Sequence, residues 1–181
     1  MANPIERKAV RIVLVDARGD VLLLHTRDLS DENFGSAWEL PGGGVEKGEL
    51  FFAAAYREIK EETGLELEET SVALPQWRRD VLYTYRGERR LQHETIAVAR
   101  IAEVAPAIST TLRVSFESED HFEYRWWSPQ DIAHSHQLFF PRSLPTQLPC
   151  LLRGDEIMET LEVWPETSHV TSPGGQSKVR S

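Results

Sequence analysis

The chain has 181 residues, of which 40% are hydrophobic and 27% charged, and its formal net charge is −9. This composition is typical of one soluble globular domain with a full core. The negative charge argues against non-specific nucleic-acid binding, because affinity for a phosphate backbone comes mainly from Lys and Arg, although it does not exclude a nucleotide held through a metal ion. Cys150 is the only cysteine, so an intramolecular disulfide is excluded.

The sequence also lacks the signals of membrane insertion and secretion. No apolar run approaches the ~20 residues that a membrane helix needs. The first residues, MANPIERKAVRIVLV, do not have the layout of a signal peptide. We therefore expect no membrane partner and a cytoplasmic location.

Two strands are predicted near the N-terminus. Ala9–Asp16, AVRIVLVD, is almost continuously apolar and β-branched, which indicates a strand buried on both faces. A turn at Arg18–Asp20 then leads into a second strand, Val21–His25. A polar loop over residues 28–35 follows and leads to Trp38, which we expect to pack beneath the next loop; stacking on a base is the alternative.

A glycine-rich loop followed by a helix comes next. Three consecutive glycines, Gly42–Gly44, give a backbone that can take positive φ and that a ligand can approach closely. Glu49–Thr63 is rich in helix formers, and Gly64 stands where helices commonly end.

The predicted helix has one strongly acidic face. Glu58, Glu61 and Glu62 are spaced i, i+3 and i+4, and the residues on the roughly opposite face are Phe52, Ala55, Tyr56 and Ile59. Like charges at this spacing destabilise a helix unless a cation neutralises them. Mg²⁺ prefers carboxylate, carbonyl and phosphate oxygens, so loop and face together suit it. The alternative is a solvated acidic helix face.

The spacing of these residues decides between the two interpretations. The segment from Gly43 to Leu65 resembles the Nudix box, G-x5-E-x7-R-E-U-x-E-E-x-G-U with U a bulky aliphatic residue, and every defined position matches. The resemblance implies a Mg²⁺-dependent hydrolase, in which Mn²⁺ often substitutes, that cleaves a pyrophosphate bond in a nucleoside diphosphate derivative. It also implies an α/β fold, an α/β/α sandwich around a mixed β-sheet.

The resemblance assigns roles residue by residue. The implied metal ligands are the carboxylates of Glu58, Glu61 and Glu62 and the carbonyl of Gly42. One of these carboxylates, often the first, serves as general base in some relatives, so all three are expected catalytic residues. Glu49 and Arg57 resemble a structural ion pair that holds the loop to the helix. Such a site suits pyrophosphate hydrolysis, because cations offset charge on the phosphoryl oxygens and activate a water without a covalent intermediate.

A basic hairpin is predicted after the box. Gln76–Tyr85 and Arg90–Ile101 read as two strands joined around residues 86–88. The densest basic cluster of the chain lies here: Arg78, Arg79, Arg86, Arg89 and Arg90. We expect most of these side chains to be solvated, while one or two are candidates for contacts with substrate phosphates.

A carboxylate from outside the box completes the metal site or acts as base in many relatives. Our first choice is Glu119, a further expected catalytic residue, followed by Glu123 and then Glu94; surface charge is the alternative for each. Tyr124–Trp127 reads as a strand, with Ser128 as N-cap of the helix that follows. Residues 139–152 read as a last helix or turn interrupted by prolines.

The expected organisation is a Nudix hydrolase domain over residues 7–155, a C-terminal extension over 156–165 and a disordered tail over 166–181. The expected partner is a nucleotide small molecule, nucleic acid is not expected, and the family alone suggests a homodimer. The alternative from a different class is a catalytically weak Nudix domain that serves as a nucleotide sensor or binding module. An RNA 5′-end activity is a third alternative, for which a basic surface would be expected. The substrate stays open among nucleoside diphosphate derivatives and nucleoside triphosphates.

Overall fold

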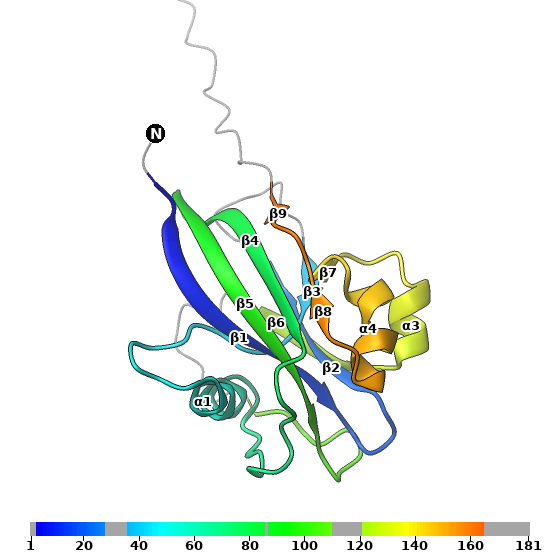
Figure 1. Cartoon of the computed structure of the whole chain (residues 1–181). Helices are drawn as coiled ribbons and strands as arrows, with labels where there is room; N and C mark the ends of the chain where they lie inside the picture. The colour runs from blue at the N-terminus through cyan, green and yellow to red at the C-terminus, as the bar shows by residue number, and fades with distance from the viewer. Residues whose placement is uncertain (1–2, 28–35, 86, 110–120, 165–181) are drawn as a thin grey trace, which may run out of the picture.

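The computed structural model describes residues 3–27, 36–85, 87–109 and 121–164. Within these residues the chain forms one mixed nine-stranded β-sheet with helices on both faces (Figure 1). The strand order along the main path is β7-β3-β2-β1-β5-β4-β8, while β6 pairs with β2 and β9 pairs with β4. The elements are β1 (Ile5–Val15), β2 (Val21–Thr26), β3 (Ala37–Glu39), α1 (Phe51–Thr63), β4 (Trp77–Tyr85), β5 (Glu88–Arg100), β6 (His121–Trp127), α3 (Pro129–His134), β7 (Phe139–Phe140), α4 (Leu144–Arg153), β8 (Ile157–Met158) and β9 (Glu162–Val163).

Strand β1 is covered on both faces, as its sequence predicts. Ile12 and Leu14 belong to the core cluster beneath α1, whereas Val13 and Val15 belong to the cluster beneath α3 and α4. The strand begins at Ile5, four residues earlier than expected, because its parallel register with β5 already pairs Ile5 with Arg90. This long parallel pairing places β1 at the centre of the sheet.

The helices form the two outer layers of the predicted sandwich. Helix α1 packs on one face through Ala55 and Ile59, while α3 and α4 lie on the other face (Figure 1). Helix α1 begins two residues later than predicted and ends at Gly64, which adopts the left-handed conformation with φ 72°. Ser128 caps α3 as predicted, because its hydroxyl accepts a hydrogen bond from Asp131 N at 3.0 Å. The predicted α/β/α arrangement is therefore confirmed.

The C-terminal part of the chain differs most from expectation. The segment predicted as a last helix or turn divides into β7, which pairs with β3, and α4, which contains Pro149. Beyond it, β8 and β9 pair in parallel with β4 and so belong to the sheet. The expected tail over 166–181 lies outside the described residues.

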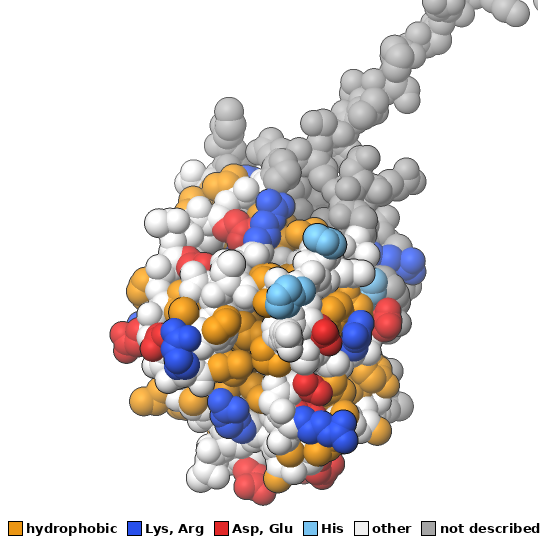
Figure 2. Space-filling view, turned by 90° about the vertical axis from the view of Figure 1, so that its right-hand side faces the viewer, with side chains coloured by type: hydrophobic (Ala, Val, Ile, Leu, Met, Phe, Trp, Pro, Cys, Tyr) orange, Lys and Arg blue, Asp and Glu red, His pale blue; other side chains and the backbone are white. Residues whose placement is uncertain are grey.

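The face over α3 and α4 carries side chains of all kinds. Figure 2 shows hydrophobic side chains gathered at its centre, with Lys and Arg scattered among Asp and Glu rather than joined in one basic patch. No described helix is both long and apolar enough to cross a membrane.

Candidate active site

The glycine-rich loop lies against the edge of β1. Val10 N donates to Gly43 O and Ile12 N donates to Pro41 O, both at 2.9 Å. Val45 N in turn donates to a β1 carbonyl, again at 2.9 Å. The loop is therefore fixed to the central strand by backbone hydrogen bonds rather than free in solution.

Two of the three glycines lie in close contact with other parts of the site. Gly42 has φ 135°, and a Cβ there would lie 2.2 Å from Val10 O. At Gly43 a Cβ would lie 2.5 Å from Glu58 Oε2. A side chain at Gly42 would clash with the backbone of β1, whereas a side chain at Gly43 would displace the carboxylate of Glu58. The absence of a side chain at Gly43 therefore provides the space in which this carboxylate lies.

The acidic face of α1 points toward this loop. Glu58 and Glu62 are buried, with 6% and 4% of their surface exposed. Glu62 Oε2 accepts a hydrogen bond from Gly42 N at 2.7 Å. The side chain of Glu61 is 44% exposed, so it stands at the rim of the site. The spacing predicted from the sequence thus brings two buried carboxylates beneath the loop and a third beside them.

The predicted ion pair between Glu49 and Arg57 is present. Arg57 Nε and Nη2 donate to the two oxygens of Glu49 at 2.9 and 2.8 Å, a bidentate arrangement. Arg57 also donates to Gly44 O at 2.9 Å and to Glu58 at 2.7 Å, and it lies 3.4 Å from Glu61. The hydrogen bond from Arg57 lowers the pKa of Glu49 to about 2. Arg57 therefore ties the loop to the helix and orients two of the acidic side chains.

Arg11 holds the predicted carbonyl ligand, a role that was not predicted from the sequence. Arg11 Nη1 donates to Gly42 O at 3.0 Å and to Leu40 O at 3.2 Å. Its Nε donates to Glu94 Oε1 at 3.3 Å. The available signal was a single arginine inside an otherwise apolar, doubly buried strand, because a buried charge requires a partner.

The three candidate carboxylates from outside the box have different surroundings. Glu119 lies outside the described residues. Glu123 is exposed, and its Oε2 lies 3.3 Å from His25 Nδ1. Glu94 is buried between Arg11 and Arg79, so it belongs to an ion network rather than to solvated surface.

Trp38 is buried and stacks on His25 with ring centroids 4.3 Å apart, which agrees with its expected packing role.

One member of the basic cluster departs from the expected solvated role. The Arg79 side chain is only 2% exposed and lies between Glu94, at 3.3 Å, and Glu162, at 2.6 Å. Arg78 is exposed, as expected, whereas Arg86 lies outside the described residues. Glu94 pairs with Arg79 across the hairpin itself, whereas Glu162 comes from a position 83 residues further along the chain. Arg79 is thus an exception to the solvated role expected of most of the cluster.

The donors around the loop fit a hard divalent cation in chemical type. They are carboxylate and carbonyl oxygens, which Mg²⁺ and Mn²⁺ prefer, and three carboxylates share the single guanidinium of Arg57. In the described part of the chain no three Asp, Glu, His or Cys side chains are gathered tightly enough to hold an ion as placed. Cation binding therefore requires some of these side chains to change position.

Comparison with known proteins identifies the family of this chain. The family profile of the NUDIX domain matches residues 5–146. The chain belongs to the Nudix family. A solved Nudix-type structure, the MutT protein from Methanosarcina mazei Go1, has a TM-score of 0.57 with 21% identity and covers 84% of this chain and 97% of its own. This likeness confirms the Nudix fold.

Curated Nudix relatives act on different substrates. An RNA pyrophosphohydrolase from Dinoroseobacter shibae is 41% identical over 137 residues, which are 71% of this chain and 81% of that protein. Another RNA pyrophosphohydrolase, from Roseobacter denitrificans, is 30% identical over 137 residues, again 71% of this chain and 81% of that protein. The nucleoside triphosphatase NudI from Escherichia coli is 31% identical over 102 residues, 56% of this chain and 68% of its own. The family is thus one of hydrolases, and its members differ in substrate.

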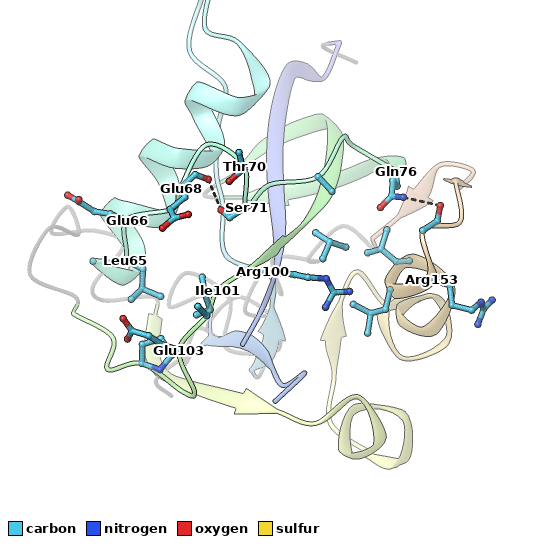
Figure 3. Close-up of a pocket in the computed structure, with 18 residues that line it drawn as sticks. Leu65, Glu66, Glu68, Thr70, Ser71, Gln76, Arg100, Ile101, Glu103 and Arg153 are labelled. Carbon is cyan, nitrogen blue, oxygen red and sulfur yellow. Dashed lines mark hydrogen bonds between the residues drawn. The ribbon is translucent and has the colours of Figure 1, made fainter. Parts of the chain in front are cut away.

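A separate pocket of about 810 Å³ lies away from the Nudix box carboxylates. Its lining residues include Leu65 and Ser71 from the connection after α1, Arg100 from the end of β5 and Arg153 from the end of α4 (Figure 3). Glu58, Glu61 and Glu62 are not among its lining residues. The pocket therefore does not extend the candidate active site.

Proposed function

We propose that the protein is a pyrophosphohydrolase that uses Mg²⁺, or Mn²⁺ in its place, to cleave a nucleoside diphosphate derivative. The observation that carries this proposal is the complete box, folded so that Glu58 and Glu62 are buried against the loop backbone at Gly42 and Gly43. Glu58, Glu61, Glu62 and the Gly42 carbonyl would hold the cation, which would offset phosphate charge and lower the pKa of a water. The proposed products are a nucleoside monophosphate and a phosphorylated partner.

The protein's own residues supply the remaining steps. Glu58 is the proposed general base, since its carboxylate lies directly beside the loop, where Gly43 has no side chain. Arg57, held by Glu49, keeps the loop and the helix at a constant distance and releases Glu58 and Glu61 when a cation binds. Glu119 is retained as a further catalytic carboxylate. The proposed compartment is the cytoplasm, and a homodimer remains the expected assembly.

A second candidate substrate is the 5′-triphosphate end of RNA. The names of the relatives from Dinoroseobacter shibae and Roseobacter denitrificans favour it. The net charge of −9 disfavours it, because affinity for RNA comes mainly from Lys and Arg. A nucleotide sensor without turnover is the alternative from another class.

The test is incubation of the purified chain with Mg²⁺ and a panel of substrates, with chromatographic separation of the products. The panel contains sugar nucleotides, dinucleoside polyphosphates, nucleoside triphosphates and a 5′-triphosphorylated RNA. Wild type is expected to cleave one class, and Glu62→Gln is expected to cleave none at a comparable rate. If neither protein cleaves any member but a nucleotide raises the melting temperature, the sensor alternative replaces this proposal.

A further inference from the structure

In the last described segment of the chain, aliphatic side chains face the solvent and an acidic and an aromatic side chain face the protein, the opposite of an ordinary edge strand. It lies beyond residue 146, where the family match ends, and is held to β4 by a hydrogen bond from Trp164 N to Leu82 O at 2.9 Å. Leu161 and Val163 are 49% and 54% exposed, whereas Glu162 and Trp164 make the contacts with the protein. Burial of aliphatic side chains therefore does not hold this segment in place; its acidic and aromatic side chains do.

The carboxylate of Glu162 lies between two guanidinium groups. Arg79 Nη2 donates to Glu162 Oε2 at 2.6 Å, and Arg142 Nε lies 3.4 Å from Oε1. Trp164 Nε1 also donates to Oε1 at 2.6 Å. Paired guanidinium groups match the oxygens of a phosphate as well as those of a carboxylate. This position is thus chemically suited to a phosphate.

The indole of Trp164 lies in an aromatic site. It stacks on Phe140 with ring centroids 4.0 Å apart and an interplanar angle of 27°. Tyr83 approaches it at 5.6 Å with an angle of 50°. Nucleobases stack on aromatic side chains in the same manner. A planar ring therefore occupies a base-sized position two residues along the chain from the carboxylate.

Arg79 provides an independent sign of a missing ligand. Its side chain is 2% exposed, yet its buried Nη1 has no hydrogen-bond partner in the described part of the chain. A buried donor without an acceptor costs free energy. Glu162 uses only Nη2, whereas a phosphate has more acceptor oxygens to offer. The Arg79 guanidinium thus keeps a donor unpaired among the described residues while Glu162 is bound to it.

This location is connected to the candidate active site. Arg79 Nε lies 3.3 Å from Glu94 Oε2, and Glu94 Oε1 accepts from Arg11 Nε at 3.3 Å. Arg11 in turn donates to Gly42 O at 3.0 Å. A continuous series of charged contacts therefore runs from Glu162 to the glycine-rich loop.

We propose that Arg79, Arg142, Tyr83 and Phe140 form a nucleoside-phosphate site that residues 159–164 of the same chain occupy as a built-in competitor. Glu162 takes the place of a phosphate and Trp164 the place of a base. A nucleotide binds by displacing this segment, which therefore lowers the apparent affinity of the enzyme. The inference rests on the proposed function only for the identity of the ligand as a nucleotide.

The experiment compares the full chain with the double variant Glu162→Gln, Trp164→Ala. The matched control, Leu161→Ala with Val163→Ala, changes the exposed side of the same strand. Binding of AMP, GMP, CMP and UMP is measured by equilibrium dialysis without metal. If the segment is closed about ten times more often than open, the double variant should bind at least one nucleotide about tenfold more tightly than wild type, and the control should not. Equal or weaker affinity overturns the inference, and weaker affinity would make Trp164 a wall of the site.

A second measurement needs no variant. Hydrogen–deuterium exchange of wild type should become faster at the Trp164 amide, now bonded to Leu82 O, when the tightest of these nucleotides is added. Unchanged or slower exchange contradicts displacement. These readouts do not depend on turnover, so failure of the substrate panel leaves them intact. Conversely, if wild type cleaves a substrate of the panel but the double variant binds nucleotides no more tightly than wild type, only this inference fails and the proposed function stands.

Discussion

Replacing Gly43 by alanine tests whether the position of the Glu58 carboxylate matters for the proposed chemistry. The new Cβ would lie 2.5 Å from Glu58 Oε2, whereas ordinary van der Waals contact begins at 3.4 Å. The carboxylate must therefore retreat by about 0.9 Å. Gly43 is not among the residues with positive φ, so the backbone itself accepts alanine.

The expected effect falls on activity rather than on folding. A misplacement of about 1 Å can cost about 100-fold in rate, which corresponds to roughly 2.7 kcal/mol of activation free energy. We expect kcat/KM of Gly43→Ala to fall by about this factor on the best substrate of the panel. The free energy of unfolding should change by less than about 1 kcal/mol, because a Gly→Ala change at a compatible φ is mildly stabilising.

The matched control is Gly44→Ala, one residue further along the same loop. Its Cβ would meet Arg7 Nη2 at 2.8 Å, the far end of a flexible side chain that can move aside. Activity should therefore stay near that of wild type. If Gly43→Ala is folded and keeps kcat/KM within a factor of about three of wild type, the carboxylate does not need this position and the reasoning is refuted.

Two further predictions concern stability. Gly42→Ala should lower the free energy of unfolding by about 3 kcal/mol or more, because it combines φ 135° with a contact of 2.2 Å to Val10 O. Gly48→Ala, at φ 83° with nothing within 4 Å, should lose only about 1–2 kcal/mol in the same urea titration, and equal losses would contradict the steric argument. Arg57 lowers the pKa of Glu49 to about 2. The contribution of this ion pair to the free energy of unfolding is therefore complete above pH ~4.5 and is lost as the pH falls toward 2. Glu49→Gln should lower the free energy of unfolding by about 1–3 kcal/mol at neutral pH and should make it less dependent on pH between about 2 and 4.5. If the variant keeps the pH dependence of wild type, the Glu49–Arg57 pair does not stabilise the fold.

The sequence predicts the loop and the acidic helix well because their signals are local. The glycines, the helix formers and the C-terminal Gly64 all act within one or two turns of chain. The continuous apolar run in β1 likewise indicates a doubly covered strand without knowledge of its neighbours. The i, i+3, i+4 spacing places Glu58 and Glu62 on one face, and both are indeed buried against the loop.

The long-range contacts could not be predicted in the same way. Arg11 reaches Gly42 O across 31 residues, and Arg79 reaches Glu162 across 83. Neither partner is marked by spacing, so arginines that bind buried groups look like solvated ones. Strands β3, β7, β8 and β9 have two or three residues each, too few for a period of two to appear. They form because the edges of β2, β3 and β4 offer backbone partners.

The most direct test of the central claim is the rate of nucleoside monophosphate release as a function of Mg²⁺ concentration, measured for wild type and for Glu62→Gln. Wild type is expected to be inactive in EDTA, to recover with added Mg²⁺ or Mn²⁺, and to saturate. Glu62→Gln should need a Mg²⁺ concentration about tenfold higher or more, since it loses one anionic oxygen ligand. Release that persists in EDTA, or identical Mg²⁺ dependence in the two proteins, would contradict a cation held by this helix and loop.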